Sequence, residues 1–212
     1  MPASASPLKQ SPHAEWTRNA SIYEVNIRQY TPEGTITAFE KQLPRLQKMG
    51  VKILWIMPVQ PIGELNRKGA MGSYYSIADY TGINPEFGTH TDFSRLVKTA
   101  HRLKMKIILD WVANHTAWDH PWIAAHPAWY KKDEKGEIVA YNYDNGREIE
   151  YWTDVVGLDY RVPGVWDAQI AAMKYWVREY DIDGFRADVA SLMPIPFWQR
   201  ARAELDAIKP MF

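Results

Sequence analysis

The sequence contains no cysteine among its 212 residues. Disulfide bonds, thiolate-bound metals and a thiol nucleophile are therefore excluded. Without disulfides to read, the sequence leaves open the redox compartment in which the chain works.

Long apolar runs are also missing, and without a run of about 18 apolar residues we expect no transmembrane helix. The opening stretch, MPASASPLKQSPHAEW, lacks the apolar core of a secretory signal peptide. We interpret residues 1–14 as a flexible tail. This pattern fits a cytoplasmic protein and equally a periplasmic or secreted protein whose signal peptide has been removed.

Neither sign of charge is in excess, because Lys+Arg and Asp+Glu each number 25. Nucleic acid and anionic membranes are therefore not expected as partners, and a neutral substrate fits better. Aromatic residues make up 13% of the chain. Stacking against the apolar faces of sugar rings is one use for them, and core packing is the other.

The chain alternates between strand-like runs and helical patterns. The strand-like runs are residues 22–27, 51–59, 105–110 and 183–189. The helical patterns are residues 35–49, 91–103, 163–180 and 196–208. The runs that begin at Val51 and Met105 are almost wholly apolar, which is typical of parallel strands covered on both faces.

Individual residues mark where the first helix should begin, divide and end. Thr35 is a suitable N-cap for the first helix, Pro44 should kink or divide that helix, and Gly50 is a suitable stop. The last four residues, KPMF, resemble the beginning of a fifth strand.

Four strand–helix units suit either an open doubly wound sheet or the first half of a (β/α)8 TIM barrel. No glycine-rich phosphate turn follows the first strand, which argues against a nucleotide-binding sheet. We therefore predict an α/β fold with about the first four βα units of a barrel, over residues 15–110 and 162–212. A whole barrel typically takes about 250 residues. Residues 111–161 break the rhythm and are interpreted as a small inserted domain, because a structureless loop of about 50 residues is improbable.

Two charged residues lie inside the last strand-like run, DGFRADV. Alternation along a strand places Arg186 and Asp188 on one face and Phe185, Ala187 and Val189 on the other. In a barrel the apolar face meets the helices, so the charged pair should point inward at the C-terminal rim, where barrel enzymes hold their active sites. A neighbouring guanidinium favours the ionised carboxylate that a nucleophile needs. The alternative is a structural ion pair.

A second polar motif is DWVANHT, in which Asp110 ends the third strand and Asn114 and His115 follow. Together they supply an acceptor, an amide and a titratable donor for a polyhydroxylated ligand. An N-cap aspartate followed by polar loop residues is the alternative.

A third stretch, GSYYSIADYTG, crowds three tyrosines around Asp79. Tyr74, Tyr75 and Tyr80 can stack on a sugar, but packing within the loop explains them equally well. The sequence alone does not choose between these uses.

Taken together, these segments resemble glycoside hydrolase family 13, the α-amylase family, from about residue 16 to the last residue. DWVANHT is similar to the first signature region of the family and GFRADVA to the second, and each follows the appropriate strand. The resemblance implies a retaining glycoside hydrolase that cleaves α-glucosidic bonds of starch-like glucans or maltooligosaccharides without a required cofactor. It also implies that residues 111–161 are the short domain B of the family.

The resemblance also implies roles for individual residues. Asp188 is the catalytic nucleophile and Arg186 its companion. His115 reaches the sugar in subsite −1, and Tyr75 stacks beneath that sugar. The residues implied to surround the substrate are Asp110, Asn114, His115 and Tyr75.

Retaining glycosidases need two carboxyl groups about 5–5.5 Å apart, a nucleophile and an acid. In the family the acid is a glutamate at the end of the fifth strand, which has scarcely begun at Phe212. We therefore expect the partner of Asp188 to lie beyond residue 212, since no glutamate present, Glu204 included, occupies its place. The 212-residue chain alone should be inactive.

Two features depart from the family pattern. Ser191 and Leu192 stand where Lys–His usually follows the nucleophile, so substrate contacts on the aglycone side should differ. The calcium site of the family uses Asn114 and an aspartate beside the LD of domain B, where this chain has Gly157. Calcium takes six to eight oxygen ligands, so the lost ligand argues against calcium at that site.

Three histidines of the expected insertion, His115, His120 and His126, invite comparison with a metal cluster. Their spacing fits no standard zinc pattern. We therefore expect no metal there.

The leading hypothesis is the N-terminal half of a retaining α-glucan hydrolase, or of a transglycosylase of the same family. The rival is a non-catalytic carbohydrate-binding or assembly half-barrel, which would self-associate through its exposed edges. The coding sequence after residue 212 discriminates between them. An open frame with an acidic residue a few positions on favours the enzyme, and a stop codon favours the rival.

Overall fold

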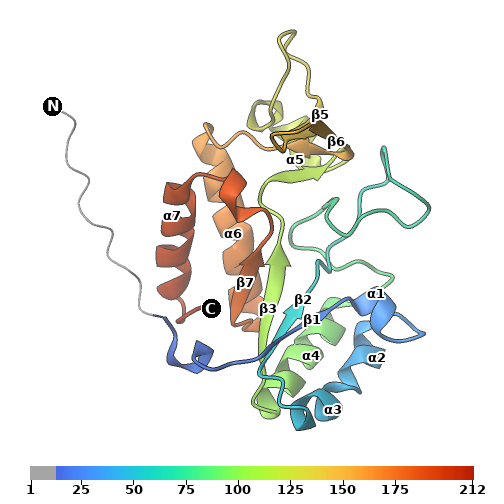
Figure 1. The fold of residues 1–212 in the computed structure, drawn as a ribbon, viewed down its shortest axis with the longest axis vertical. Coiled ribbons are helices and arrows are strands. Elements are labelled where there is room, and N and C mark those ends of the chain that lie inside the picture. Colours follow the sequence, from blue (N-terminus) through green and yellow to red (C-terminus); the bar gives the residue numbers. More distant parts are fainter. Residues whose placement is uncertain (1–12) are drawn as a thin grey trace, which may run out of the picture.

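The computed structural model describes residues 13–212 (Figure 1). Most of the tail expected over residues 1–14 thus lies outside the described residues. Ala14 is buried, and Trp16, in a short 3-10 helix over Glu15–Thr17, lies 6.0 Å from the ring of Phe212. The packed structure therefore begins slightly earlier than the sequence indicated.

Four parallel strands form the central sheet in the order β1–β2–β3–β7 (Figure 1). They are β1 (Ile22–Val25), β2 (Ile53–Ile56), β3 (Lys106–Trp111) and β7 (Gly184–Ala187). The side chains of β2 and β3 are almost all buried, as expected of parallel strands with both faces covered. This arrangement confirms the predicted partial barrel of four βα units.

The helices follow the predicted alternation, and the ends of the predicted ones are shifted by at most two residues. They are α1 (Ile27–Tyr30), α2 (Ile36–Glu40), α3 (Leu43–Lys48), α4 (His90–Arg102), α6 (Pro163–Tyr180) and α7 (Ile195–Asp206). Ile27 was expected in the first strand but begins α1, because the side chain of Asn26 caps that helix.

The residues predicted to begin, divide and end the first helix do so. The hydroxyl of Thr35 accepts the backbone N–H of Ala38, which caps α2. Pro44 lies in the first turn of α3, and the expected single helix is divided just before it. Gly50 has φ +88°, the left-handed conformation of a helix stop.

A second, antiparallel sheet lies at one end of the molecule, in the order β4–β6–β5 (Figure 1). Its strands are β4 (His115–Ala117), β5 (Ala140–Asp144) and β6 (Ile149–Gly157), with α5 (Pro121–Ala125) and a 3-10 turn at Pro127–Trp129. Trp111 was expected in the insertion but belongs to β3, where it is fully buried and donates from Nε1 to Gln169 at 2.9 Å. The insertion therefore starts later than predicted.

The last residues, KPMF, form no regular strand. Met211 is buried, and the backbone N–H of Phe212 donates to the carbonyl of Asp183 at 2.9 Å, so a single strand-like bond forms beside β7. Over residues 13–212, no helix is long and apolar enough to cross a membrane.

Candidate active site

Two neighbouring strands bring the polar motifs together at the C-terminal edge of the sheet. The register of β3 and β7 pairs Asp110 directly with Arg186. Nη1 of Arg186 donates to Oδ1 and Oδ2 of Asp110 at 3.1 and 3.2 Å and to Oδ1 of Asp188 at 2.7 Å. Two sequence motifs that are far apart along the chain therefore share one guanidinium.

Burial and charge act against each other in this cluster. The carboxyl group of Asp110 is fully buried, and burial raises its pKa to about 6, although Arg186 and the indole N–H of Trp55 favour the charged form. Burial disfavours the charge of Arg186, but Asp110 and Asp188 together raise its pKa. The arginine is therefore charged, and its position is fixed by two acceptors.

Trp55 is a part of the cluster that the sequence motifs did not reveal. Its Nε1 donates to Oδ2 of Asp110 at 3.0 Å, and the guanidinium of Arg186 lies 4.7 Å from its ring centroid. A cation over an indole face is attracted to it. The available signal was an indole N–H inside the otherwise aliphatic strand VKILWIMPV.

The structure gives different roles to the three tyrosines that the sequence analysis could not distinguish. The hydroxyl of Tyr75 donates to Oδ2 of Asp110 at 3.3 Å, and burial, followed by the charges of Asp110 and Asp188, raises its pKa. Tyr80 is buried and its hydroxyl donates to two backbone carbonyls, while the ring of Tyr74 lies under the guanidinium of Arg28. Loop packing thus explains Tyr74 and Tyr80, whereas Tyr75 belongs to the site.

Asn114 and His115 are both buried where β3 passes into the insertion. Nδ2 of Asn114 lies 3.1 Å from Nδ1 of His115. An amide nitrogen can only donate, so Nδ1 accepts and the ring proton resides on Nε2. Burial lowers the pKa of His115 to about 4, so the ring is neutral at pH 7 and serves as a fixed donor.

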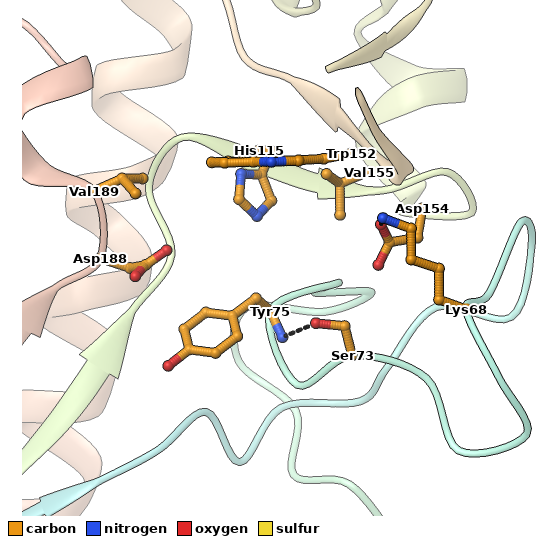
Figure 2. A pocket seen from close by; sticks show the side chains of 9 residues that line it. All are labelled: Lys68, Ser73, Tyr75, His115, Trp152, Asp154, Val155, Asp188 and Val189. Atoms are coloured by element: carbon orange, nitrogen blue, oxygen red, sulfur yellow. Dashed lines mark hydrogen bonds and ion pairs between the residues drawn. The ribbon is translucent and has the colours of Figure 1, made fainter. Parts of the chain in front are cut away.

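Asp188 lies just after the end of β7, held by a bond from its N–H to the carbonyl of Trp111 at 2.9 Å. The next residue, Val189, has φ 40° and ψ 41°, a left-handed conformation that is rare for a β-branched residue. Alternation predicted Val189 on the helix-facing side, but it lines the same pocket as Asp188 (Figure 2). That expectation was wrong because the strand ends at Ala187, and strain beside a reactive group is typical of functional sites.

These groups surround a pocket of about 360 Å³ between the sheet edge and the insertion. Figure 2 shows Asp188 at one end, Tyr75 on one side, and His115 with Trp152 on the opposite side. The lining residues are Lys68, Ser73, Tyr75, His115, Trp152, Asp154, Val155, Asp188 and Val189. The sequence analysis missed Lys68, Trp152 and Asp154, which no motif connects, and it gave no role to Ser73 within GSYYSIADYTG.

A family model described as alpha amylase, catalytic domain, matches residues 9–206. The chain belongs to the α-amylase family. This membership confirms the resemblance drawn from the two signature regions and agrees with the partial barrel.

Relatives of known structure or activity differ in chemistry. Alpha-amylase 3 of Dictyoglomus thermophilum is 29% identical over 92% of this chain and 42% of its own length. An alpha-1,4-glucan:maltose-1-phosphate maltosyltransferase of Rhodospirillum rubrum is 32% identical over 90% of this chain and 30% of its own. The crystal structure of an alpha-amylase from Lactobacillus plantarum, 42% identical, matches with a TM-score of 0.84 over 92% of this chain and 44% of that one. This chain therefore spans less than half the length of these relatives.

The residues at the calcium position of the α-amylase family do not fit the ion. Gly157 offers no side-chain oxygen, and a Cβ built there would lie 2.6 Å from the ring of Tyr141 and 3.2 Å from Cδ of Lys131. The ammonium of Lys131 lies 4.8 Å from the ring centroid of Tyr141, which places a positive charge beside this position. Calcium needs oxygen ligands. Beside Asn114, the position of Gly157 offers an aromatic ring and a lysine instead.

The other histidines of the insertion have structural contacts. Nδ1 of His120 accepts the backbone N–H of Trp122 at 3.1 Å, which caps α5. His126 stacks on Trp129 at 3.9 Å between ring centroids. Over residues 13–212, no three His, Asp or Glu side chains lie close enough together to hold a metal.

Of the two unusual residues after Asp188, Leu192 packs against the core from a 3-10 turn at Ala190–Leu192, and Ser191 is exposed. Neither offers the paired cationic groups usual in the family. Altered contacts on the aglycone side remain our expectation for this chain.

Proposed function

We propose that this chain carries the nucleophile half of a retaining active site for α-glucosidic bonds in starch-like glucans or maltooligosaccharides. The observation that carries the proposal is the position of Asp188. Its Oδ1 accepts from Arg186, while the carboxylate also faces a pocket lined by Tyr75 and His115. An oriented carboxylate beside a sugar-sized cavity is what nucleophilic attack on an anomeric carbon requires.

In the proposed reaction, a carboxylate oxygen of Asp188 bonds to the anomeric carbon while the glycosidic C–O bond breaks. The leaving oxygen takes a proton from a general acid, which we propose is supplied by protein outside residues 1–212. Tyr75 supports the sugar ring, and Nε2–H of neutral His115 donates to a hydroxyl. Water, activated by the same acid in its basic form, then releases the sugar.

Transfer is the second candidate, because a relative that is 32% identical is named as a maltosyltransferase. The covalent intermediate is the same in both reactions. In transfer the acceptor is a phosphate or a sugar hydroxyl, and in hydrolysis it is water. We further propose that the antiparallel sheet over residues 115–157 is the domain B that closes the site in either case.

The test is Asp188→Asn in a completed barrel, by which we mean this chain joined to a second barrel half. The amide keeps the shape of the side chain but cannot form the glycosyl ester, so cleavage of maltooligosaccharides should be lost and folding retained. Asp167→Asn on the exposed face of α6 is the matched control and should keep full turnover. Retention of more than a few per cent of wild-type turnover by Asp188→Asn would remove Asp188 from this role.

A further inference from the structure

The end of the pocket opposite Asp188 contains a charged pair from two different segments (Figure 2). We propose that Lys68 and Asp154 form a specificity site that binds the hydroxyl groups of the second sugar unit of the substrate. This inference rests on the proposed function, since it assumes that a first sugar unit lies beside Asp188.

The geometry of the pair is specific. Nζ of Lys68 lies 3.1 Å from Oδ1 of Asp154. The side chain of Asp154 is 7% exposed and that of Lys68 is 51% exposed. A carboxylate this deeply buried is costly unless it is paired. Both residues line the same cavity as Asp188 and Tyr75, so the pair faces the pocket.

The loop that carries Lys68 is fastened to the insertion on both sides of that residue. Oδ2 of Asp119 accepts the backbone N–H groups of Glu64 and Leu65 at 2.7 and 3.2 Å. The hydroxyl of Ser76 donates to the backbone carbonyl of Asp154 at 3.0 Å. A Cβ at Gly63 would lie 2.3 Å from Cβ of Ala117, so only a glycine at this position lets the loop pack this closely against the insertion. These contacts position Lys68 over the pocket.

The chemistry of the pair suits a neutral, hydroxyl-rich ligand. An ammonium has three donors, and the bond to Asp154 uses one of them, so donors remain for sugar oxygens. The carboxylate can accept from a neighbouring hydroxyl through its remaining lone pairs. The two charges cancel, so the site selects hydroxyl groups and not a charged ligand. The ring of Trp152, which lines the same pocket 5.6 Å from the ring of His115, supplies an apolar face for stacking.

The position of the pair determines which sugar unit it contacts. A sugar whose anomeric carbon lies at Asp188 extends its other ring positions along the pocket, past Tyr75 and His115. We place the next unit at the end of the pocket that holds the Lys68–Asp154 pair, which Figure 2 shows opposite Asp188. Glucose alone should gain nothing from the pair, whereas maltose should.

The test is titration of the 212-residue chain with glucose and with maltose, followed by tryptophan fluorescence and calorimetry. Lys68→Met keeps the aliphatic stem and removes the ammonium. Hydrogen bonds to charged groups are among the stronger ones, so we expect maltose affinity to fall about tenfold or more and glucose affinity to stay unchanged. Lys135→Met, on an exposed turn of the insertion, is the matched control and should change neither affinity.

Asp154→Asn is the second variant, and it should weaken maltose binding in the same selective way. The double variant should lose little more than either single variant, because the two groups act as a unit. Equal maltose affinity in wild type, Lys68→Met and Asp154→Asn would overturn the inference while leaving the proposed function intact. Failure of the wild-type chain to bind either sugar would instead overturn the proposed function, and this inference with it.

Discussion

At the scale of single residues, the site depends on one guanidinium nitrogen. Nη1 of Arg186 contacts both Asp110 and Asp188, and Asp110 also accepts from Trp55 and Tyr75. Asp110 is therefore the buried anchor that fixes Arg186, and Arg186 in turn orients the carboxylate that faces the pocket. Such an anchor places a charge where burial disfavours it.

This conflict makes the stability of the fold depend on pH. Burial raises the pKa of Asp110 from 3.8 to about 6, while the unfolded chain titrates near the ordinary value. Between these values the folded state binds more protons, so the contribution of Asp110 to stability falls as the pH rises. Asp110→Asn cannot titrate, so the variant does not lose this stability as the pH rises. The free energy of unfolding of the variant minus that of the wild type should therefore increase by about 3 kcal/mol from pH 4 to pH 7.

Urea unfolding of both proteins at several pH values measures this difference, with Asp144→Asn on the exposed end of β5 as a control that should show no such trend. If the variant instead becomes relatively less stable as the pH rises, then Arg186 and Trp55 outweigh burial, and the pKa of Asp110 is lowered.

The residues of this cluster were predictable to different degrees. Arg186, Asp188 and Asp110 were identified because charge inside apolar strands is conspicuous and because strand periodicity fixes direction. Trp55 was missed because a tryptophan in an apolar strand is typical of a packed core. The direction of Val189 was predicted wrongly, since alternation fails once a strand ends and the backbone turns left-handed.

At the scale of elements, the four strands and the helices between them were predictable from period and punctuation. The presence of the insertion was also predictable, but its internal contacts and those of the loop over residues 57–89 were not, because these contacts join segments far apart in the chain. Lys68 and Asp154 carry no motif, and only the folding of the loop against β6 brings them together. The expectation that a calcium ligand is missing rests on Gly157 in the sequence, but the lysine beside it could not be predicted.

The insertion gives the prediction at this scale. Because we expect no calcium site beside Gly157, Tyr141 and Lys131, the melting temperature of the chain should be the same in EDTA and in excess calcium. A ligand that binds only the folded state would raise that temperature by mass action. Thermal unfolding by circular dichroism checks this, with magnesium as the control cation. A fall of many degrees in EDTA that calcium reverses would mean that other oxygens hold the ion.

At the scale of the whole molecule, the sheet is open. Within the described chain, β1 and β7 are its edge strands. On the outer side of β7, the single hydrogen bond from Phe212 to Asp183 is the one strand-like contact that the described residues make. Unpaired edges of a parallel sheet invite pairing with another chain. The other carboxylate of the active-site pocket, Asp154, lies at the end opposite Asp188 and is paired with Lys68. We therefore propose that the general acid of a retaining reaction is not among the described residues.

The 212-residue chain should therefore show no hydrolysis of starch or maltooligosaccharides above background, since general acid catalysis is typically worth about 10²–10⁴-fold in rate. It should also self-associate instead of remaining a monomer. Reducing-sugar assays and light scattering of the purified chain measure the two properties. Turnover that Asp188→Asn abolishes would reveal an acid within these residues, and a stable monomer would show that the edges are covered.

The most direct test of the account is covalent trapping at Asp188. A 5-fluorinated α-glucosyl fluoride needs no proton for its leaving group, and the second fluorine slows release of the sugar. We predict that the completed barrel gains the mass of one fluoroglucosyl group, that the modified peptide contains Asp188, and that Asp188→Asn gains none. A label on another residue, or an unchanged label in Asp188→Asn, would contradict the assignment of the nucleophile.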